Sequence, residues 1–165
     1  MEVTYKTIGI IRSEFTSKDC TPIQSVFSTA RGAIELFPEY VDGLKDIEGF
    51  SHLYLIYHFN QADGCFVSQK PFLDGKKERG IFAIRHFNRP NPIGISIVEL
   101  KGVRDNTLEI AGVDILDGTP LLDIKPFVRQ FDSRENVRNG WVDEQHIETI
   151  KVKSFTPECL GERRE

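Results

Sequence analysis

The chain has 165 residues, of which 39% are hydrophobic and 28% are charged, so we expect one globular domain with a buried core. Its 21 lysines and arginines against 25 aspartates and glutamates give a formal net charge of −4, unlike the basic composition of most nucleic-acid-binding domains. The first residues lack the basic and apolar regions of a signal peptide, and no stretch is apolar enough to cross a membrane as a helix.

The alternation of apolar and polar residues favours short β-strands, which we expect at residues 3–13, 51–59, 81–83, 95–100 and 108–113. Residues 38–43 are expected to form one or two helical turns that end at Gly43. The segment 146–153 also alternates, with Ile150 and Val152 on one face, and it is predicted to be a strand. Residues 64–79 and 129–143 are polar and are predicted to be exposed connections, and residues 157–165 a charged tail.

Many short strands with no sustained helical period and no alternation of strand and helix indicate an all-β fold, either a closed barrel or a sandwich. The same pattern excludes a doubly wound α/β fold. Residues 1–156 are therefore expected to form one β domain with short helical turns and long loops.

The cysteines, Cys20, Cys65 and Cys159, are far apart and form no CxxC pair, so the sequence predicts neither a zinc site nor a disulfide framework. His52 and His58 share one face of an expected strand but have no partner at metal-ligand spacing, so structural roles are favoured for both. We expect no metal ion, and a reducing cytoplasm is the expected compartment.

The segment 80–96 carries the most information about function. It places Arg85, His86, Arg89 and a nearby asparagine between two expected strands, on backbone that two prolines make stiff. Gly94 then allows the backbone to approach another group closely before the second strand begins. Pre-organised polar groups between strands are typical of a binding site, although a stiff turn with locally paired arginines would give the same pattern.

This segment resembles the signature of the YaeB-like (TsaA) family, whose characterised members are tRNA methyltransferases that use S-adenosylmethionine. Further family motifs are matched in order by Gly9-Ile-Ile-Arg-Ser13, Pro22-Ile-Gln24, Gly49-Phe-Ser-His-Leu53, Asp117-Gly-Thr-Pro120 and Asp123-Ile-Lys-Pro-Phe127. The likeness covers most of the chain. It implies a small β-barrel that forms a homodimer, with the cofactor site completed near the subunit interface.

The resemblance also implies a binding site for S-adenosylmethionine, assembled from separate segments of the chain. The matching positions are Pro22, Ile23, Gln24, Asn60, Gln61, Arg85, Ile95, Asp114, Ile115, Leu116 and Asp117. These residue types suit the cofactor, because its ribose needs carboxylate or amide acceptors, its carboxylate a guanidinium and its adenine apolar walls. Ile23 replaces a family arginine, and Asn60 stands where bacterial relatives often have histidine. Either departure could change the methyl acceptor while the cofactor stays the same.

The family reaction methylates N6 of the threonylcarbamoyl-modified adenosine that follows the tRNA anticodon, within a loop of unstacked bases. Alignment of nitrogen, methyl and sulfur supplies much of such an acceleration, and a modest base assists it. Asp117, Asp123 and His86 are candidate bases, and the sequence does not choose between them.

Two other functions remain open: methylation of another RNA or of a small molecule, and a non-enzymatic module that binds the cofactor. The acidic net charge, and the absence here of a C-terminal domain present in longer bacterial relatives, favour another acceptor slightly. If the acceptor is tRNA, the expected phosphate contacts are Lys76, Lys77 and Arg79. The alternative face bears Arg129, Arg134 and Arg138.

Overall fold

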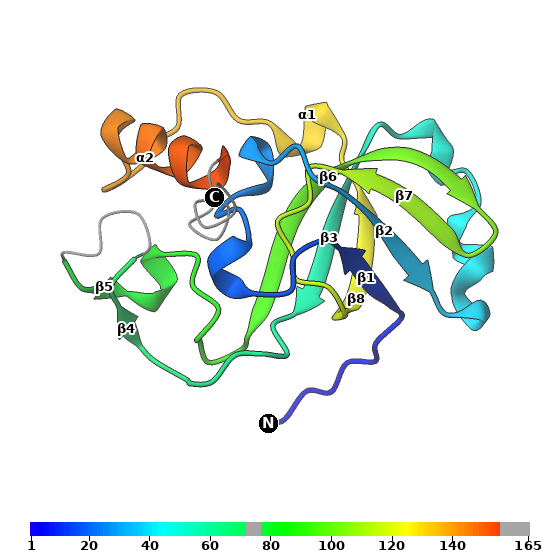
Figure 1. The fold of residues 1–165 in the computed structure, drawn as a ribbon, viewed down its shortest axis with the longest axis horizontal. Coiled ribbons are helices and arrows are strands. Elements are labelled where there is room, and N and C mark those ends of the chain that lie inside the picture. Colours follow the sequence, from blue (N-terminus) through cyan, green and yellow to red (C-terminus); the bar gives the residue numbers. More distant parts are fainter. Residues whose placement is uncertain (72–76, 156–165) are drawn as a thin grey trace, which may run out of the picture.

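A computed structural model of the chain describes residues 1–71 and 77–155. Its main feature is a closed antiparallel barrel with the strand order β1-β2-β7-β6-β3-β8 (Figure 1). The barrel strands are β1 (Gly9–Ser13), β2 (Arg31–Leu36), β3 (His52–His58), β6 (Ile93–Arg104), β7 (Thr107–Ala111) and β8 (Thr119–Pro126). A separate two-stranded sheet pairs β4 (Ser68–Gln69) with β5 (Arg79–Gly80). The prediction of a small all-β barrel is confirmed.

Alternating residues of the strands fill the barrel interior. On β3, Leu53 and Leu55 are completely buried and Tyr57 is nearly so, whereas His52 and Tyr54 face outward. Each aliphatic side chain buried in this way stabilises the fold by roughly 1.5–3 kcal/mol. The strict inside–outside alternation fixes the register between β3 and β6.

The long strand β6 has a buried and an exposed face. Gly94, Ser96 and Val98 point inward, while Ile95 and Ile97 point outward with 52% and 38% of their surface exposed. A register shift between Leu100 and Gly102, opposite β7, then changes the alternation before the strand ends. β6 therefore carries an apolar outer stripe along the barrel wall.

Short 3-10 helices occupy the connections. They are η1 (Lys18–Cys20), η2 (Ser25–Phe27), η3 (Pro38–Leu44), η4 (Ile47–Gly49) and η5 (Ile81–Ala83). η3 confirms the helical turns expected at residues 38–43, and Pro38 stands in its first turn, where no backbone donor is needed. At 81–83 the strand prediction is wrong, because the chain forms η5 with Ile81 buried.

The prediction of a strand at 146–153 is also wrong, because these residues lie within helix α2 (Glu144–Phe155). The carboxylate of Asp143 accepts the backbone N–H of His146 at 3.0 Å, which caps the helix start. Ile150 is 4% exposed but Val152 is 63% exposed, so the two do not share a buried face. Local capping and the ion pair between Glu148 and Lys151, at 2.5 Å, favour the helix over the apparent alternation.

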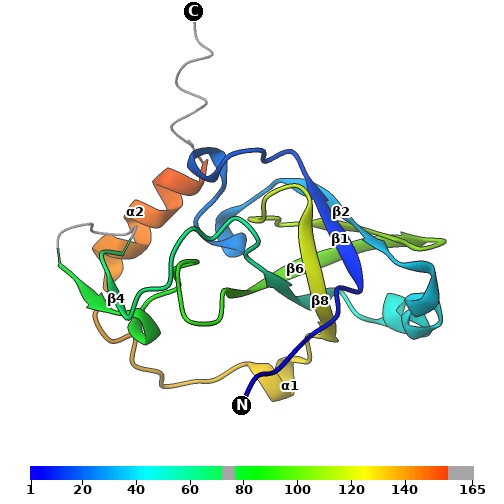
Figure 2. The same ribbon diagram turned by 90° about the horizontal axis from the view of Figure 1, so that it is seen from below.

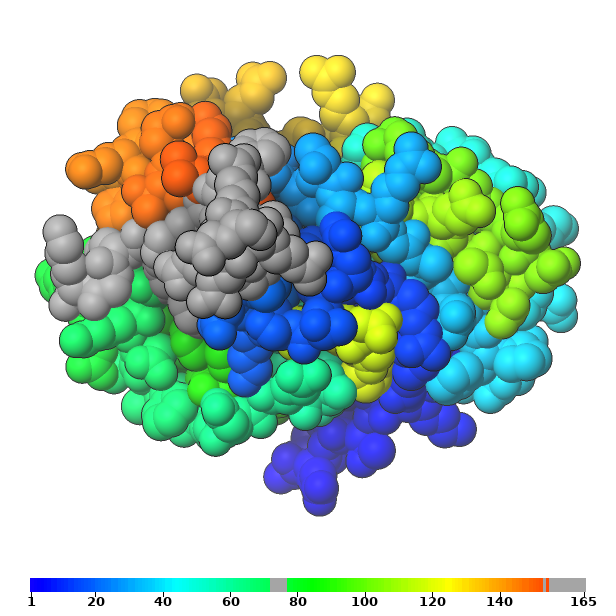
Figure 3. Space-filling model, in the orientation of Figure 1, coloured from blue at the N-terminus to red at the C-terminus, as the bar shows by residue number. Residues whose placement is uncertain are grey.

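The segment from α1 (Arg129–Asp132) to α2 crosses the molecule and ends beside the loops at one mouth of the barrel (Figures 1 and 2). The indole of Trp141 donates to the carbonyl of Ala83 at 2.8 Å, and the guanidinium of Arg79 lies 4.2 Å from the Trp141 ring centroid. α2 packs against η2, and Figure 3 shows the helix at the surface, on the side of the molecule away from β7. This segment thus links η5 and β5 to η2.

Other sequence predictions need correction at their boundaries. The first strand begins at Gly9 rather than at residue 3, and β2 and β8 were not predicted. The sequence of β8 gives no clear indication of a strand, because it contains two prolines and its apolar and polar residues do not alternate regularly. Cys65 is a free, exposed thiol.

Two predicted features lie outside the described residues: Lys76 and the tail 157–165. Within the described ranges, no helix is both long and apolar enough to cross a membrane. The same residues contain no group of three or more histidine, cysteine or carboxylate side chains that could hold a metal ion.

Candidate functional site

Loops from four parts of the chain surround a hollow of about 400 Å³ at one mouth of the barrel. These loops follow β1, β3 and β7 and precede β6. Ten of the positions predicted to bind the cofactor line it: Pro22, Ile23, Gln24, Asn60, Gln61, Arg85, Ile95, Asp114, Ile115 and Leu116. The fold therefore unites segments that are far apart in the sequence, in a hollow of the size usual for small-molecule sites.

Asp117 is the predicted position that does not line this hollow. Its carboxylate accepts the backbone N–H of Ser13 at 3.2 Å and lies 3.9 Å from the guanidinium of Arg12. These contacts tie the β7–β8 connection to β1. A role of Asp117 in cofactor binding stays a prediction.

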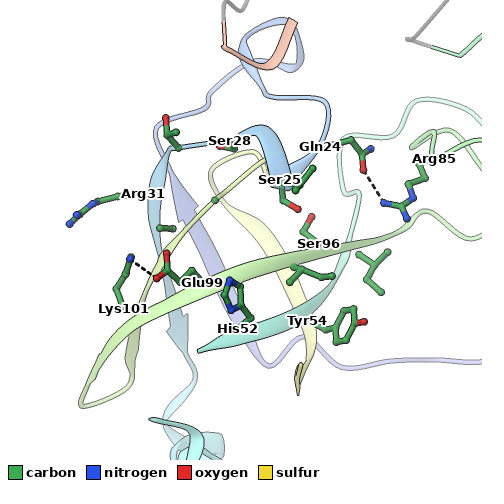
Figure 4. Close-up of a pocket in the computed structure, with 16 residues that line it drawn as sticks. Gln24, Ser25, Ser28, Arg31, His52, Tyr54, Arg85, Ser96, Glu99 and Lys101 are labelled. Carbon is green, nitrogen blue, oxygen red and sulfur yellow. Dashed lines mark hydrogen bonds and ion pairs between the residues drawn. The ribbon is translucent and has the colours of Figure 1, made fainter. Parts of the chain in front are cut away.

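Arg85 and Gln24 join the signature segment to the first loop. The Arg85 guanidinium donates to Oε1 of Gln24 at 2.9 Å (Figure 4). Within the described residues Arg85 forms no ion pair with a carboxylate, so the alternative of a locally paired structural arginine does not describe it. Its remaining donors are available to a ligand in the hollow.

A hydrogen-bonded chain of three side chains forms part of the wall. The Ser96 hydroxyl donates to Oδ1 of Asp114 at 2.6 Å, and the Tyr57 hydroxyl lies 3.0 Å from the Ser96 oxygen. Burial raises the pKa of Asp114 to about 6, against the opposing effects of hydrogen bonds from Ser96 and Ser25 and of the Arg85 charge. Asp114 is thus ionised at neutral pH, but less easily than an exposed aspartate.

Gly94 makes this wall possible, as the sequence suggested. A Cβ atom at this position would lie 2.2 Å from the ring of Tyr57, which is too close for any side chain. The Tyr57 ring in turn packs edge-on against Phe59, with ring centroids 5.3 Å apart. The close approach predicted for Gly94 is therefore to an aromatic ring of the adjacent strand.

The first hollow is also lined by residues that the sequence analysis did not single out. The Lys18 ammonium donates to the carbonyl of Gln61 at 2.8 Å and lies 4.5 Å from the ring centroid of Phe87. Phe59 and Phe87 add apolar surface to the same hollow. The sequence offered one signal for these residues. An aromatic residue, Phe59, comes directly after β3, and another, Phe87, comes directly after His86.

Of the candidate bases, only His86 lines the hollow. Its Nδ1 accepts the backbone N–H of Asn88 at 3.0 Å, and burial lowers its pKa, so the imidazole is neutral at neutral pH. Asp123 lies on β8 and pairs with Lys125 at 2.7 Å, away from these walls. Asp114 adds a carboxylate that was assigned only to cofactor binding.

A second hollow of about 640 Å³ runs along the outer face of β6 (Figure 4). We call it the β6 groove. Gln24, Arg85 and Ile95 line both spaces. The groove is further lined by Ser25, Val26, Ser28, Thr29, Arg31, His52, Tyr54, Ser96, Ile97, Glu99, Lys101, Ala111 and Gly112.

The side chains of the first hollow suit S-adenosylmethionine. Arg85 and Lys18 offer cations for a carboxylate, and the amides of Asn60 and Gln61 offer partners for a ribose. The partly buried carboxylate of Asp114 is a suitable neighbour for a positive sulfonium. Aromatic and aliphatic walls provide the apolar surface that adenine requires.

Comparison with known proteins identifies the family. A model of the tRNA-methyltransferase O N-terminal domain matches residues 10–133. The chain belongs to this family. The matched residues include most of the barrel and every position that the sequence analysis assigned to the cofactor.

Individual relatives agree with this assignment. A probable S-adenosyl-L-methionine-binding protein of Pyrococcus abyssi is 52% identical over 142 residues, covering 86% of this chain and 77% of that protein. The tRNA (adenine(37)-N6)-methyltransferase of Escherichia coli is 35% identical over 164 residues, covering 93% of this chain and 69% of that protein. A crystal structure of TrmO matches with a TM-score of 0.76 and 39% identity over 86% of this chain. This chain spans 65% of that solved chain.

Proposed function

We propose that the chain is an S-adenosylmethionine-dependent methyltransferase that acts on N6 of threonylcarbamoyladenosine beside the tRNA anticodon. The observation that carries this proposal is the meeting of ten family cofactor positions around one hollow in a chain of the tRNA-methyltransferase O family. The names of relatives that bind S-adenosylmethionine or methylate tRNA support it.

Each part of the cofactor is assigned to residues with suitable chemistry. S-adenosylmethionine, when bound, supplies an electrophilic methyl group. Arg85 and Lys18 hold the carboxylate of the ligand, while Asn60 and Gln61 bind its ribose. Phe59 and its aromatic neighbours exclude water, which strengthens these polar contacts.

Proton removal from the acceptor nitrogen is assigned to the wall that contains Asp114. Its carboxylate has a pKa raised to about 6 and accepts a hydrogen bond from Ser96, a buried residue of β6 that lies between Ile95 and Ile97 of the β6 groove. A base with a pKa slightly below the working pH takes up a proton without needing a strongly basic group. The neutral imidazole of His86 is the alternative base within the hollow.

The proposal includes a homodimer acting in the cytoplasm. Val67, which directly precedes β4, is 77% exposed, and Phe82 on η5 is 82% exposed. The backbone N–H of Ile81 donates to the carbonyl of Val67 at 2.9 Å, so these apolar side chains belong to neighbouring segments. Exposed apolar groups of this kind are usual at subunit interfaces. Sedimentation analysis of the purified chain measures its mass directly.

The experiment that tests the function is transfer of labelled methyl from S-adenosylmethionine to bulk tRNA. The substrate tRNA comes from cells that lack the methylation, and the control tRNA lacks the threonylcarbamoyl group as well. We expect label only in the first sample, at the adenosine that follows the anticodon. Equal labelling of both samples favours another RNA acceptor, and labelling of neither contradicts the proposed reaction.

A further inference from the structure

We propose that the β6 groove is the binding site for the single-stranded acceptor RNA, with the target nucleoside at the end of the groove that Arg85 forms. The inference rests on the proposed function, because it assumes an RNA acceptor. It assigns the RNA to a surface different from Lys77, Arg79 and the loop around them.

The position of the groove is the first argument. Methyl transfer requires acceptor and donor to lie side by side, with reacting atoms about 3–3.5 Å apart. A ligand in the first hollow and a ligand in the β6 groove would meet where Gln24, Arg85 and Ile95 form a shared wall. An RNA lying along β6 therefore reaches the cofactor hollow without passing through the protein.

Charge is the second argument. Arg31, Arg85 and Lys101 line the groove against a single carboxylate, Glu99, so it is positive within a chain of formal charge −4. The Lys101 ammonium pairs with Glu99 at 2.7 Å. Arg31 forms no hydrogen bond or ion pair with any described residue, and its charge helps to lower the pKa of the Glu99 carboxyl. An exposed, unpaired guanidinium at the end of a groove is suited to bind phosphate.

The groove walls are the third argument. Ile95 and Ile97 form an apolar floor, and the rings of His52 and Tyr54 stand beside it (Figure 4). The Phe127 ring packs near both rings, with centroid distances of 6.4 Å to His52 and 5.7 Å to Tyr54.

Held rings next to apolar side chains provide a surface on which unstacked bases can lie. From Ile95 to Lys101 the strand extends about 20 Å, enough for a short run of nucleotides.

By contrast, the loop first expected to bind RNA is a poorer candidate. Arg79 is stacked on Trp141, which is itself hydrogen-bonded to the carbonyl of Ala83. This arginine therefore has a structural role in joining the α2 segment to η5. Lys76 lies outside the described residues.

The test measures binding of a synthetic anticodon stem-loop that contains threonylcarbamoyladenosine, in the presence of S-adenosylhomocysteine and over a range of salt concentrations. Arg31→Glu reverses the charge in the groove. Lys6→Glu is the matched control, because it makes the same charge change beside β1, which lies across the barrel from β6. Tyr54→Leu removes the ring while keeping an apolar side chain.

We expect Arg31→Glu to weaken RNA binding about tenfold or more and to lower the dependence on salt by about one phosphate contact. Tyr54→Leu should weaken binding with little change in that dependence, because stacking is largely independent of counterions. Lys6→Glu should stay within about twofold of the parent. All three variants should keep the parental affinity for S-adenosylhomocysteine, and Arg31→Glu and Lys6→Glu should also keep the parental melting temperature.

The groove assignment is overturned if Arg31→Glu binds RNA like Lys6→Glu, or if the parent binds no RNA. It is also overturned if Ile97→Asp converts a dimer into monomers, because the groove would then be covered by a second copy of the chain. A parent that binds the stem-loop through the groove but transfers no methyl to it contradicts the proposed reaction alone.

Discussion

Arg85 occupies the position where the two hollows meet, and its geometry makes a substitution by lysine informative. The guanidinium can donate to Gln24 and to a ligand carboxylate at the same time, whereas an ammonium on a flexible chain cannot hold both in a fixed plane. We expect Arg85→Lys to lower methyl transfer by about tenfold or more with an unchanged melting temperature. Arg12→Lys is the matched control, because Arg12 also donates at 2.9 Å, to Glu35 on the outer face of the barrel.

Two measurements separate the possible results for Arg85. Calorimetry with S-adenosylhomocysteine reports cofactor affinity, and initial rates with tRNA report turnover. If Arg85→Lys and Arg12→Lys both retain near-parental rates, Arg85 is a structural residue and its place in the proposed site is wrong.

Asp114 gives a prediction about pH and stability. Its pKa of about 6 in the folded protein exceeds its ordinary value near 3.8, so the folded state retains the proton to higher pH than the unfolded state does. The contribution of Asp114 to stability therefore falls as pH rises from about 4 to 6, and it stays low above that range. We expect Asp114→Asn to be more stable than the parent by roughly 2–3 kcal/mol at pH 7.5, with the difference disappearing near pH 4.

Urea unfolding of the parent and the variant at several pH values measures this difference. Asp123→Asn is the control, since Asp123 on β8 is only partly buried and its carboxylate pairs with Lys125. A stability difference that does not change with pH contradicts the raised pKa of Asp114. If Asp114→Asn is more stable than the parent but no longer transfers methyl, the Asp114 carboxylate is needed for activity and lowers the stability of the folded protein.

Helix α2 gives a prediction at the scale of a structural element. The helix packs against η2, which follows Gln24 directly, so it supports the loop that contributes to both hollows. Ile150 is 4% exposed, and Ile150→Ala should destabilise the helix by about 2–4 kcal/mol. We expect faster hydrogen exchange in α2 and η2, unchanged exchange in β3 and β6, and weaker binding of S-adenosylhomocysteine.

Val152→Ala is the control for this prediction, because Val152 is on the same helix but 63% exposed. It should leave exchange and ligand affinity close to those of the parent. If Ile150→Ala loosens α2 without altering η2 or ligand affinity, the helix does not support the site.

The elements also show what the sequence could and could not predict. The alternation of apolar and polar residues was sufficient to predict strands β3 and β6, where one face is buried and the other is exposed. It misled at α2, because Ile150 and Val152 alternate over too few residues to outweigh the Asp143 cap. It missed β8, whose pairing partners β1 and β3 are far away in the sequence, so local patterns carry little information about it.

At the scale of the whole molecule, closure of the barrel explains why family motifs were needed to predict the site. The site residues belong to separate loops, represented by Gln24, Asn60, Arg85 and Asp114. Only the strand order β1-β2-β7-β6-β3-β8 brings these loops to the same mouth of the barrel. No single segment predicts that meeting. The walls formed by Lys18 and the aromatic rings were missed for the same reason, since their neighbours come from distant loops.

That assembly from distant loops leads to a prediction for ligand binding by the whole domain. A ligand that contacts four loops binds the folded state and not the unfolded chain, so it stabilises the protein by mass action. At a concentration about one hundred times its Kd, S-adenosylhomocysteine should add about 2.7 kcal/mol, which corresponds to a rise in melting temperature of roughly 5–10 °C. Arg85→Lys should show a smaller rise at the same concentration, and Arg12→Lys the parental one. A parent whose melting temperature and calorimetric heat do not respond to millimolar ligand would have no cofactor site at this mouth of the barrel, and both the methyltransferase and the cofactor-binding alternative would be wrong.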